Sequence, residues 1–301
     1  MGTFFSCSTK LLLLFFIVSA IPIAIIVHLE TGGRPSSHVI QYHSTGWFRE
    51  CAKWDDQGRR FLVTFFDGGV GQIPVPLDYD EGSAGSVLQE TVVVKEVDFA
   101  LAAYDLSTWK RIFLTKLGGP EDEKSFADDV AVDEEGNAYI TDAKASKIWK
   151  VGPEGELQHT IRSPLFTPKE WYKNLVALNG IVYHPNGYLL VVHTFSGNLY
   201  KVQTAKGNKV EIVNVVGGSL RFGDGLLLVS PDKLVVAGNP TRLVESSDDW
   251  ESARIVGKSK DAIHRVATAA TEKDGRVYVS HLVGMGYPRR KHVLVEAVFS
   301  A

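Results

Sequence analysis

The sequence predicts an all-β fold, a six-bladed β-propeller preceded by an N-terminal hydrophobic leader. The prediction rests on a repeated hairpin phrase, on the spacing between its copies, and on strand-forming segments near both ends of the domain. In each copy Asp, Asn or Gly supplies the turn, and β-branched or aromatic residues supply the strands. A unit that cannot bury its apolar face alone must stack on copies of itself, as propeller blades do. The five clear copies are WDDQGRRFLVT (54–64), VDEEGNAYITD (132–142), YHPNGYLLVVH (183–193), VSPDKLVVAGN (229–239) and TEKDGRVYVSH (271–281).

The spacing of the turn glycines predicts the number of blades. Gly58 and Gly136 are 78 residues apart, whereas Gly136 and Gly187 are 51 apart. The longer gap is about two repeats, so it should contain a degenerate copy. Residues 97–117 fit this copy, with a strand, a turn at Asp105–Ser107 and a second strand. Five clear copies and this one predict six blades.

Strand-forming segments at the two ends are expected to close the ring. Residues 38–44 and 292–299 should pair with each other, because an open sheet edge promotes aggregation. We therefore predict a single domain from residue 35 to residue 301. Further strands are expected after three of the phrases, at 146–152, 197–203 and 241–247.

Composition and charge exclude some classes of protein. The chain has 301 residues, of which 45% are hydrophobic and 22% charged, as in a globule with its own core. The net charge is -3 and no basic stripe with interleaved aromatic residues occurs, so nucleic-acid binding is not expected. Of the two cysteines, Cys7 lies in the leader and Cys51 in the domain, so no disulfide is expected within the domain.

An uncharged apolar run of seventeen residues, Leu11–Val27, makes up most of the leader. Lys10 precedes it, which predicts a cytoplasmic N-terminus and translocation of everything that follows. The run is intermediate between a signal-peptide core and a spanning helix of about twenty residues. Residues 1–30 are therefore either a cleaved signal peptide or a membrane anchor. In both cases the propeller is expected in the secretory pathway (extracellular, vacuolar or lumenal), on the non-cytoplasmic side of the membrane.

Oxygen-bearing side chains precede the inner strand of several predicted blades. Because inner strands begin near the central channel, these side chains should converge. Carboxylates with an amide carbonyl are the ligands of a hard cation, Ca²⁺ above all, with Mg²⁺, Mn²⁺ and Zn²⁺ as alternatives. Like charges in a narrow channel repel, and a cation would hold them together. The residues are Glu50, Asp128 with Asp129, Asn179 and Asp224, at intervals of 78, 51 and 45 residues.

Each of these residues also has an ordinary structural explanation. Asp and Asn are common at turns, and Asn-Gly or Asp-Gly alone is a hairpin signal. The agreement in phase between four of them is what supports a metal site. No paired histidine or cysteine motif of a zinc site occurs.

Three of these motifs resemble the senescence-marker/gluconolactonase family, a calcium-dependent phosphotriesterase-like group of six-bladed propellers related to paraoxonases and strictosidine synthase-like proteins. They are Glu50 before a Trp-Asp turn, Asn179–Gly180 before an apolar strand, and Asp224–Gly225 before another. The resemblance covers essentially the whole chain after the leader. It implies one catalytic divalent cation, bound by Glu50, Asn179 and Asp224. Where the family usually has an Asn-Asp pair, this chain has Asp128–Asp129, and the additional carboxylate changes the charge of the site.

The mechanism that the resemblance implies is metal-assisted hydrolysis of a lactone or an ester, phosphoesters included. Asp224 is expected both to bind the cation and to act as a general base, with Asp128 as a second catalytic carboxylate. Asp129 and His264 are candidates for orienting substrate or water. The partner expected is thus a small-molecule substrate, with the membrane as a second partner if the leader is retained.

Three histidines near the same face are candidate proton shuttles. They are His193, His264 and His281, and for each a packed or surface histidine is the preferred interpretation.

Two further functions stay open. One is a non-catalytic propeller that binds a protein or a small ligand and keeps an ion for stability. The other is a strictosidine synthase-like enzyme, which is disfavoured because the catalytic glutamate of true strictosidine synthases has no convincing match. Fold alone does not choose between them, since propellers host both catalysis and binding.

Overall fold

A computed structural model describes residues 21–22, 24–29, 38–66, 68–79, 87–95, 100–118, 123–259 and 262–300. The chain divides into two compact units, Met1–Ser37 and His38–Ala301. In the first unit residues 21–22 and 24–29 are helical, and most of the predicted leader lies outside the described residues. Within the described part of the chain, no helix has the length and apolar character needed to cross a membrane.

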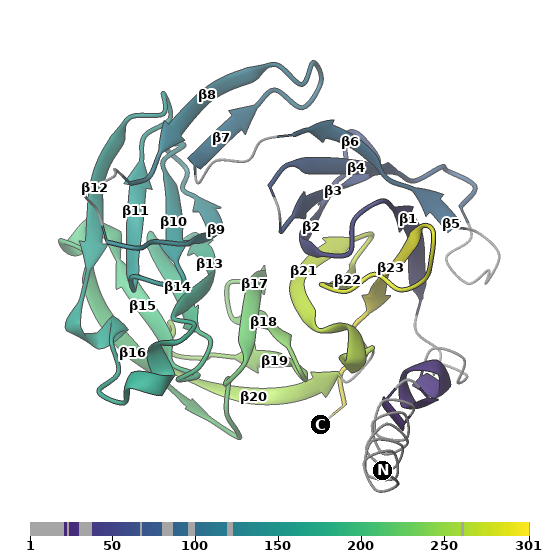
Figure 1. The fold of residues 1–301 in the computed structure, drawn as a ribbon. Coiled ribbons are helices and arrows are strands. Elements are labelled where there is room, and N and C mark those ends of the chain that lie inside the picture. The colour runs from purple at the N-terminus through teal and green to yellow at the C-terminus, as the bar shows by residue number, and fades with distance from the viewer. Residues whose placement is uncertain are drawn as a thin grey trace, which may run out of the picture. The chain divides into compact units, whose positions relative to one another are not determined.

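The second unit consists of β-strands in mainly antiparallel sheets, which confirms the all-β class (Figure 1). One sheet contains β2 (Arg49–Asp55), β3 (Arg60–Phe65), β4 (Val70–Pro74) and β6 (Thr91–Val94). A two-stranded sheet contains β7 (Ala100–Tyr104) and β8 (Arg111–Lys116). The next contains β9 (Ala127–Val132), β10 (Ala138–Asp142), β11 (Lys147–Val151) and β12 (Leu157–Arg162).

The rest of the unit continues the pattern of four strands. Two four-stranded units pair in parallel through β16 and β20 and so form one eight-stranded sheet. The first has β13 (Leu178–His184), β14 (Tyr188–His193), β15 (Leu199–Gln203) and β16 (Lys209–Val216). The second has β17 (Gly223–Ser230), β18 (Lys233–Gly238), β19 (Thr241–Glu245) and β20 (Ser252–Ser259). The last sheet has β21 (Ala267–Lys273), β22 (Arg276–His281), β23 (Arg290–Glu296), β1 (Val39–Ser44) and β5 (Val87–Gln89). Four short 3₁₀ helices connect strands: η1 (Pro164–Phe166), η2 (Trp171–Asn174), η3 (Thr204–Lys206) and η4 (Ile263–Arg265).

The five repeated phrases form the hairpins β2–β3, β9–β10, β13–β14, β17–β18 and β21–β22, and the first strand of each hairpin is called here a first strand. Their turns use the residues that the sequence indicates. Gly136, Gly187 and Gly275 have φ of +85°, +86° and +73°, a left-handed conformation that favours glycine. In the second phrase Asp133 Oδ1 accepts hydrogen bonds from the backbone nitrogens of Glu135 and Asn137. The degenerate copy is also a hairpin, β7–β8, with Asp105 at its turn.

The predicted closure of the ring is confirmed. Strand β1 pairs antiparallel with β23, and Ile40 lies opposite Leu294. The first strands contact one another in the order β9, β13, β17, β21 and β2, and they surround one axis (Figure 1). The two-stranded β7–β8 sheet lies between the sheets of β2 and β9 in the chain. The count of six blades stays a prediction.

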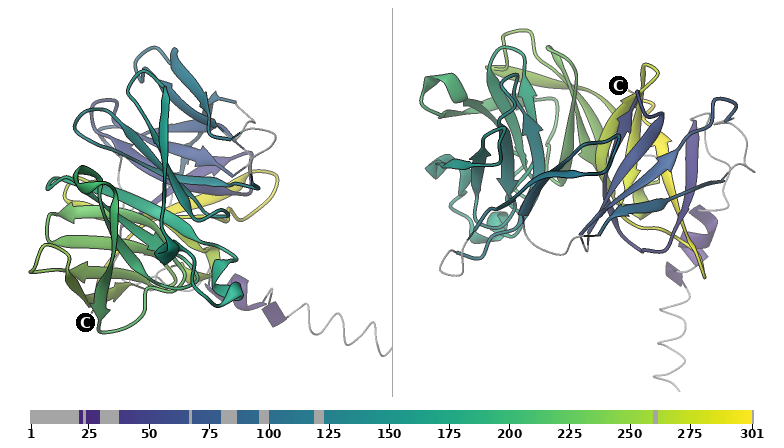
Figure 2. Two further views of the ribbon diagram at one scale, coloured as in Figure 1. Left: turned by 90° about the vertical axis from the view of Figure 1, so that its left-hand side faces the viewer. Right: turned by 90° about the horizontal axis from the view of Figure 1, so that it is seen from above.

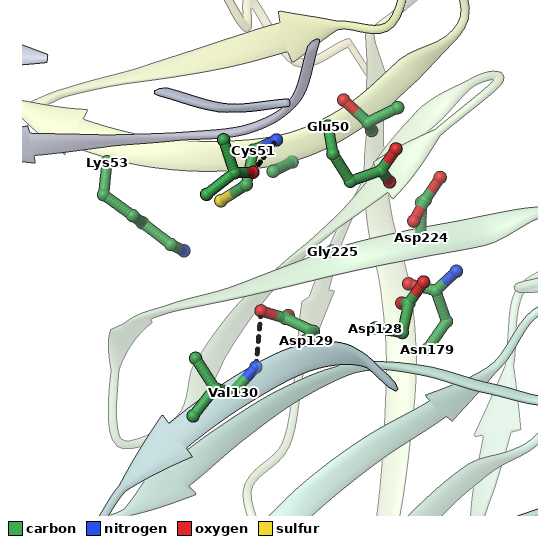
Figure 3. A pocket seen from close by; sticks show the side chains of 12 residues that line it. Glu50, Cys51, Lys53, Asp128, Asp129, Val130, Asn179, Asp224 and Gly225 are labelled. Atoms are coloured by element: carbon green, nitrogen blue, oxygen red, sulfur yellow. Dashed lines mark hydrogen bonds between the residues drawn. The ribbon is translucent and has the colours of Figure 1, made fainter. Parts of the chain in front are cut away.

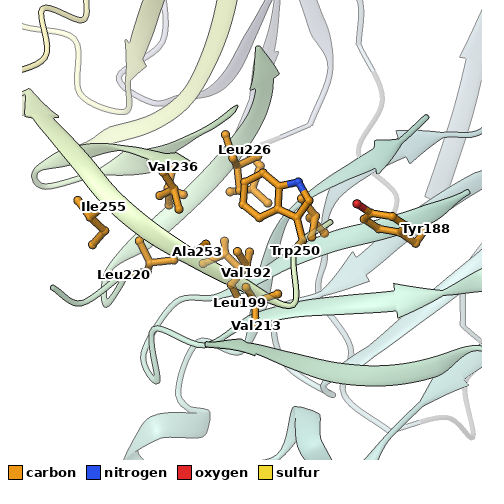
Figure 4. Close-up of a cluster of buried hydrophobic side chains, with 13 residues drawn as sticks. Tyr188, Val192, Leu199, Val213, Leu220, Leu226, Val236, Trp250, Ala253 and Ile255 are labelled. Atoms are coloured by element: carbon orange, nitrogen blue, oxygen red, sulfur yellow. The ribbon is translucent and has the colours of Figure 1, made fainter. Parts of the chain in front are cut away.

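Neighbouring sheets pack face to face (Figure 2). Clusters of buried apolar side chains lie between them. A cluster between the β13–β16 and β17–β20 units contains Leu190, Leu226 and Trp250, all nearly inaccessible to solvent (Figure 4). Trp250 also donates a hydrogen bond from Nε1 to the Pro231 carbonyl at 2.8 Å. Burial of such side chains stabilises the fold by roughly 1.5–3 kcal/mol each, so the inter-sheet layers hold the ring of first strands in place.

The strand directions define two faces of the second unit. Each first strand starts at one face, called here the mouth face, and ends at its hairpin turn on the opposite face, the base face. From β21 to β22, β23 and β1 the direction alternates. Strand β1 therefore runs from base to mouth, and His38 enters the domain at the base face.

Candidate functional site

Five first strands share one irregularity, a β-bulge close to the mouth face. In β2 the partners Arg49–Phe65 and Ala52–Val63 leave two residues opposite Thr64 alone. Strands β9, β13, β17 and β21 show the same register shift at the same place. A bulge redirects the side chains that it contains, and here five bulges point toward one axis. The bulge residues are Glu50–Cys51, Asp128–Asp129, Asn179–Gly180, Asp224–Gly225 and Thr268.

The bulges bring the predicted oxygen donors together in one cavity of about 230 Å³. Glu50, Asp128, Asn179 and Asp224 gather on one side of it, from four different strands (Figure 3). Asp129 lies on the other side with Cys51 and Lys53. The cavity also contains Thr268, which sequence reasoning missed although it occupies the equivalent bulge in β21.

The predicted histidines do not join this group. His264 lies on η4 and lines neither this cavity nor the outer cavity described below, so its assignment to substrate orientation has no geometric support. His193 and His281 are buried within the sheets, as the preferred interpretation holds. Burial lowers the pKa of His193 to about 4, which keeps this imidazole neutral at physiological pH.

The glycines after Asn179 and Asp224 serve close packing of strands and not hairpin turns. A Cβ atom on Gly180 would lie 2.3 Å from the Asp224 carbonyl oxygen, and one on Gly225 would lie 2.8 Å from the Thr268 carbonyl oxygen. These distances are far below van der Waals contact. The Asn-Gly and Asp-Gly pairs therefore allow the first strands to approach at the axis, and they lie inside β13 and β17.

Two anchors fix the direction of the bulges. Beside Glu50, the buried Arg49 guanidinium makes a bidentate ion pair with Glu90 at 2.6 Å for both contacts, and lies 3.8 Å above the Phe65 ring. Thr141 Oγ1 accepts the backbone N–H of Asp129 at 3.1 Å and donates to the Asn179 carbonyl at 2.6 Å. The bulges are thus held by buried polar contacts, which favours a preorganised site.

The Asp129 carboxylate is committed to the backbone. Its Oδ1 accepts from Val130 N at 2.8 Å and its Oδ2 from Ile181 N at 3.2 Å, which ties β9 to β13. Burial raises the pKa of Asp129, while Lys53 and these N–H groups counteract that rise. Asp129 therefore links β9 to β13, and its two carboxylate oxygens have few acceptor positions left for the predicted orientation of substrate or water.

The other three carboxyl groups are crowded together and half-buried in the cavity. Burial, with the Asp129 charge, raises the pKa of Glu50 to about 7. Burial and the neighbouring carboxylates raise the pKa of Asp128 and of Asp224 well above the usual range. Burial also raises the pKa of the Cys51 thiol to about 12, so this thiol is neutral.

Such a set of oxygens fits a hard divalent cation in its chemistry. Among the described residues, no group of three or more His, Cys, Asp and Glu side chains is close enough to hold a metal ion as it stands. The amide oxygen of Asn179 could be a further metal ligand. The Asn179 side chain hydrogen-bonds to Asp224. To bind one ion together, these side chains would have to approach one another more closely.

A larger cavity of about 430 Å³ opens from this group toward the mouth face. It shares Glu50, Asp128, Asn179 and Asp224 with the inner cavity, and we call it the outer cavity. The residues that form the walls of the outer cavity were not predicted from the sequence. The sequence does contain a signal for them, because the residue two positions before each bulge is apolar. These residues are Phe48, Phe126, Ala177, Phe222 and Val266, and two of them, Phe126 and Val266, line the outer cavity.

Solved structures that are similar to this chain share its fold and little of its sequence. The structure of U3-55K has a TM-score of 0.56 at 7% identity, covering 88% of this chain and 100% of that chain. A luciferin-regenerating enzyme has a TM-score of 0.55 at 13% identity, covering 87% and 96%. Virginiamycin B lyase from Staphylococcus aureus has a TM-score of 0.51 at 9% identity, covering 87% and 100%. Neither a family model nor a curated protein matches the chain.

The fold and the likeness define the class of protein as a β-propeller. The lyase and the luciferin-regenerating enzyme are β-propellers, so the architecture predicted from the repeated phrase is confirmed at this level. Membership of the gluconolactonase-type family stays a prediction. At identities this low the likeness concerns the fold alone, and the function has to be argued from the site.

Proposed function

We propose that this protein is a metal-dependent hydrolase of lactones or esters, phosphoesters included, with one divalent cation in the channel of a six-bladed propeller. The observation that carries the proposal is the convergence of Glu50, Asp128, Asn179 and Asp224, from four strands, on four equivalent bulges. Buried carboxyl groups that repel one another cost folding free energy, so a sequence that keeps them has a use for them. Ca²⁺ is the first candidate, with Mg²⁺, Mn²⁺ and Zn²⁺ as alternatives.

In this proposal Glu50, Asn179 and Asp224 hold the cation. When bound, a divalent cation polarises a carbonyl or phosphoryl oxygen and lowers the pKa of water. The Asp128 carboxylate lines both cavities and lies beside the group, so it is placed to take the proton of an attacking water, a role it shares with Asp224. Water oxygen adds to the carbonyl carbon, the carbon–oxygen ester bond breaks, and the proton passes to the leaving oxygen.

We further propose that the leader places the propeller on the non-cytoplasmic side of a membrane, in the secretory pathway. Its support is the apolar run Leu11–Val27 with Lys10 before it. Protease protection of the full chain in sealed microsomes tests this. A propeller digested without detergent would contradict it.

The test of the site begins with cation binding to the full-length chain in detergent after treatment with a chelator. We expect one Ca²⁺ per chain, lost in Glu50→Gln and in Asp224→Asn. Asp55→Asn is the matched control, since Asp55 lies on the same strand, away from the channel, and pairs with Arg60 at 2.8 Å. Equal Ca²⁺ binding in Glu50→Gln and wild type would contradict the assigned ligands.

The second step is a screen of lactones and aryl esters with and without the cation. Hydrolysis that chelation abolishes reversibly supports the enzyme. A stoichiometric ion with no hydrolysis of any substrate would support the alternative, a binding propeller that uses the ion for stability. A strictosidine synthase-like activity has no specific observation in its favour.

A further inference from the structure

The outer cavity has an acidic floor and an apolar wall. Its floor is the carboxylate group of Glu50, Asp128 and Asp224, and its wall comes from loops of four different sheets. The apolar side chains of this wall are Phe66, Phe126, Leu175, Val176, Val266 and Leu282.

Three of the six apolar wall residues, Phe66, Leu175 and Val266, are exposed to solvent. Phe66 is 57% exposed and Leu175 is 53% exposed. Phe66 packs against Phe126 with ring centroids 6.2 Å apart, so the two rings form one aromatic surface. Apolar side chains that line a cavity and stay in contact with water favour an apolar occupant, because the occupant releases that water.

One basic side chain also lines the outer cavity. Lys144 is the basic residue among those that line the outer cavity in the described part of the chain. It follows β10 in a loop at the mouth face, where its backbone N–H donates to Asp142 Oδ1 at 2.9 Å, and it is exposed. A positive charge at the rim attracts an anionic group, whereas the floor carries acids that disfavour further negative charge, so a ligand with one anionic end should bind with that end at the rim.

We propose that the substrates are amphiphilic acids: compounds with an uncharged ester or lactone at one end, an aryl or alkyl body, and an anionic group at the other end. The ester end reaches the carboxylate floor, the body lies against Phe66 and Phe126, and the anion meets Lys144 Nζ. For its chemistry this inference rests on the proposed function, whereas its ligand preference is measurable without any reaction.

The test measures binding of two probes of the same shape, 6-phenylhexanoate and its neutral amide 6-phenylhexanamide. Calorimetry is done on the full-length protein in detergent with a chelator present, so that no cation at the floor attracts the carboxylate. We expect the acid to bind about three- to tenfold more tightly than the amide. Lys144→Gln removes this preference and Lys144→Arg keeps it. Phe66→Ser weakens both probes by about the same factor, and its exposure makes a loss of folding unexpected.

Lys169→Gln is the control, because Lys169 is an exposed lysine of a neighbouring loop that does not line the cavity. Equal affinity for the acid and the amide in wild type would overturn the inference, as would a preference unchanged in Lys144→Gln. Hydrolysis of small neutral lactones without preference for amphiphilic acids would leave the proposed function intact and contradict this inference. A preference for the acid in a protein that hydrolyses no ester would support this inference and contradict the proposed function.

Discussion

At the scale of single residues, the channel holds acids in an environment that disfavours their charge. Glu50, Asp128 and Asp224 are half-buried beside one another in the cavity, and each has a raised pKa. Such an arrangement makes the metal-free protein less stable than it would be with neutral residues. It also makes the group a strong attractor for a cation.

Replacement of Asp224 separates stability from function. Asp224→Asn keeps the shape and the hydrogen-bonding partner Asn179 but removes an acid whose charge the cavity disfavours, so the melting temperature of the metal-free protein should rise at neutral pH. Hydrolysis in the presence of the cation should fall by about 10²-fold or more, because a ligand and a general base are lost together. Calorimetry and initial rates on the same preparation test this. Unchanged rates would remove Asp224 from the mechanism.

The pH dependence of stability follows from the raised pKa of Glu50. In the folded protein this carboxyl keeps its proton up to about pH 7, whereas its ordinary pKa is 4.5. Its stabilising contribution is therefore complete below pH 4.5 and is lost as the pH rises through 7. We expect Glu50→Gln and wild type to be equally stable near pH 4.5. At pH 8 without metal, the variant should be more stable by roughly 1–3 kcal/mol.

The comparison of variant with wild type removes the opposing effect of the buried histidines. His193 and His292 have pKa values lowered to about 4 by burial, so they reduce stability as the pH falls below their ordinary value of 6.5. Both proteins contain them equally. Urea unfolding at several pH values measures the difference, and a difference that does not grow with pH would contradict the assigned pKa of Glu50.

The spacing of the acids predicts their convergence because it agrees with the repeat, whereas the individual partners of a side chain leave no such signal. Thr268 is not predicted because a threonine in a strand needs no explanation. The predicted role of Asp129 toward substrate or water stays a prediction, and in the structure both of its oxygens accept backbone N–H groups of β9 and β13. His264 is close to the first strand in sequence, but the η4 turn keeps it out of the cavities.

At the scale of elements, the bulged first strands are what convert a repeat into a site. In all five the bulge lies at the same register position, and in β13 and β17 a glycine makes the crossing of backbones at the axis sterically feasible. The sequence contained these glycines, but as Asn-Gly and Asp-Gly pairs they have the appearance of turn signals. Only the close approach of neighbouring strands shows why a side chain is excluded.

Gly180→Ala tests this close approach. Its Cβ would lie 2.3 Å from the Asp224 carbonyl and 2.7 Å from Leu226 N, both backbone atoms that side-chain rotation cannot move. We expect a loss of about 1–3 kcal/mol or more from overpacking, together with displacement of Asp224 and weaker cation binding. Gly207→Ala is the control, because nothing lies within 4 Å of its Cβ position and only its φ of +66° opposes alanine. Equal losses in the two variants would contradict a specific role for Gly180.

At the scale of the whole molecule, the two ends of the propeller are held by the pairing of β1 with β23. The hydrophobic pattern predicted this pairing, and the register places Ile40 opposite Leu294 in one buried cluster with Phe61. The added strands β5 and β6 were not predicted. Both strands are short, and β5 pairs in parallel with β1, which needs no hairpin turn. The sequence therefore contains no turn motif that predicts them.

Leu294→Ala should weaken the closure. Leu294 is fully buried between β1 and the neighbouring sheet, so its truncation leaves a cavity and should cost about 2–5 kcal/mol. Val298→Ala, at a position that is 55% exposed near the same end of the chain, should cost less than about 0.5 kcal/mol. Thermal unfolding of both variants measures the contrast. If the two melting temperatures matched, the closing strands would not limit stability.

The direction of β1 has a consequence for how this domain meets its surroundings. Because His38 lies at the base face and β1 runs toward the mouth, the chain enters the second unit at the face opposite the cavities. A biosensor chip or a bead attached at His38 leaves the opening turned to the bulk solution. Attachment at His38 is therefore the orientation in which an immobilised propeller should keep full access for dissolved ligands.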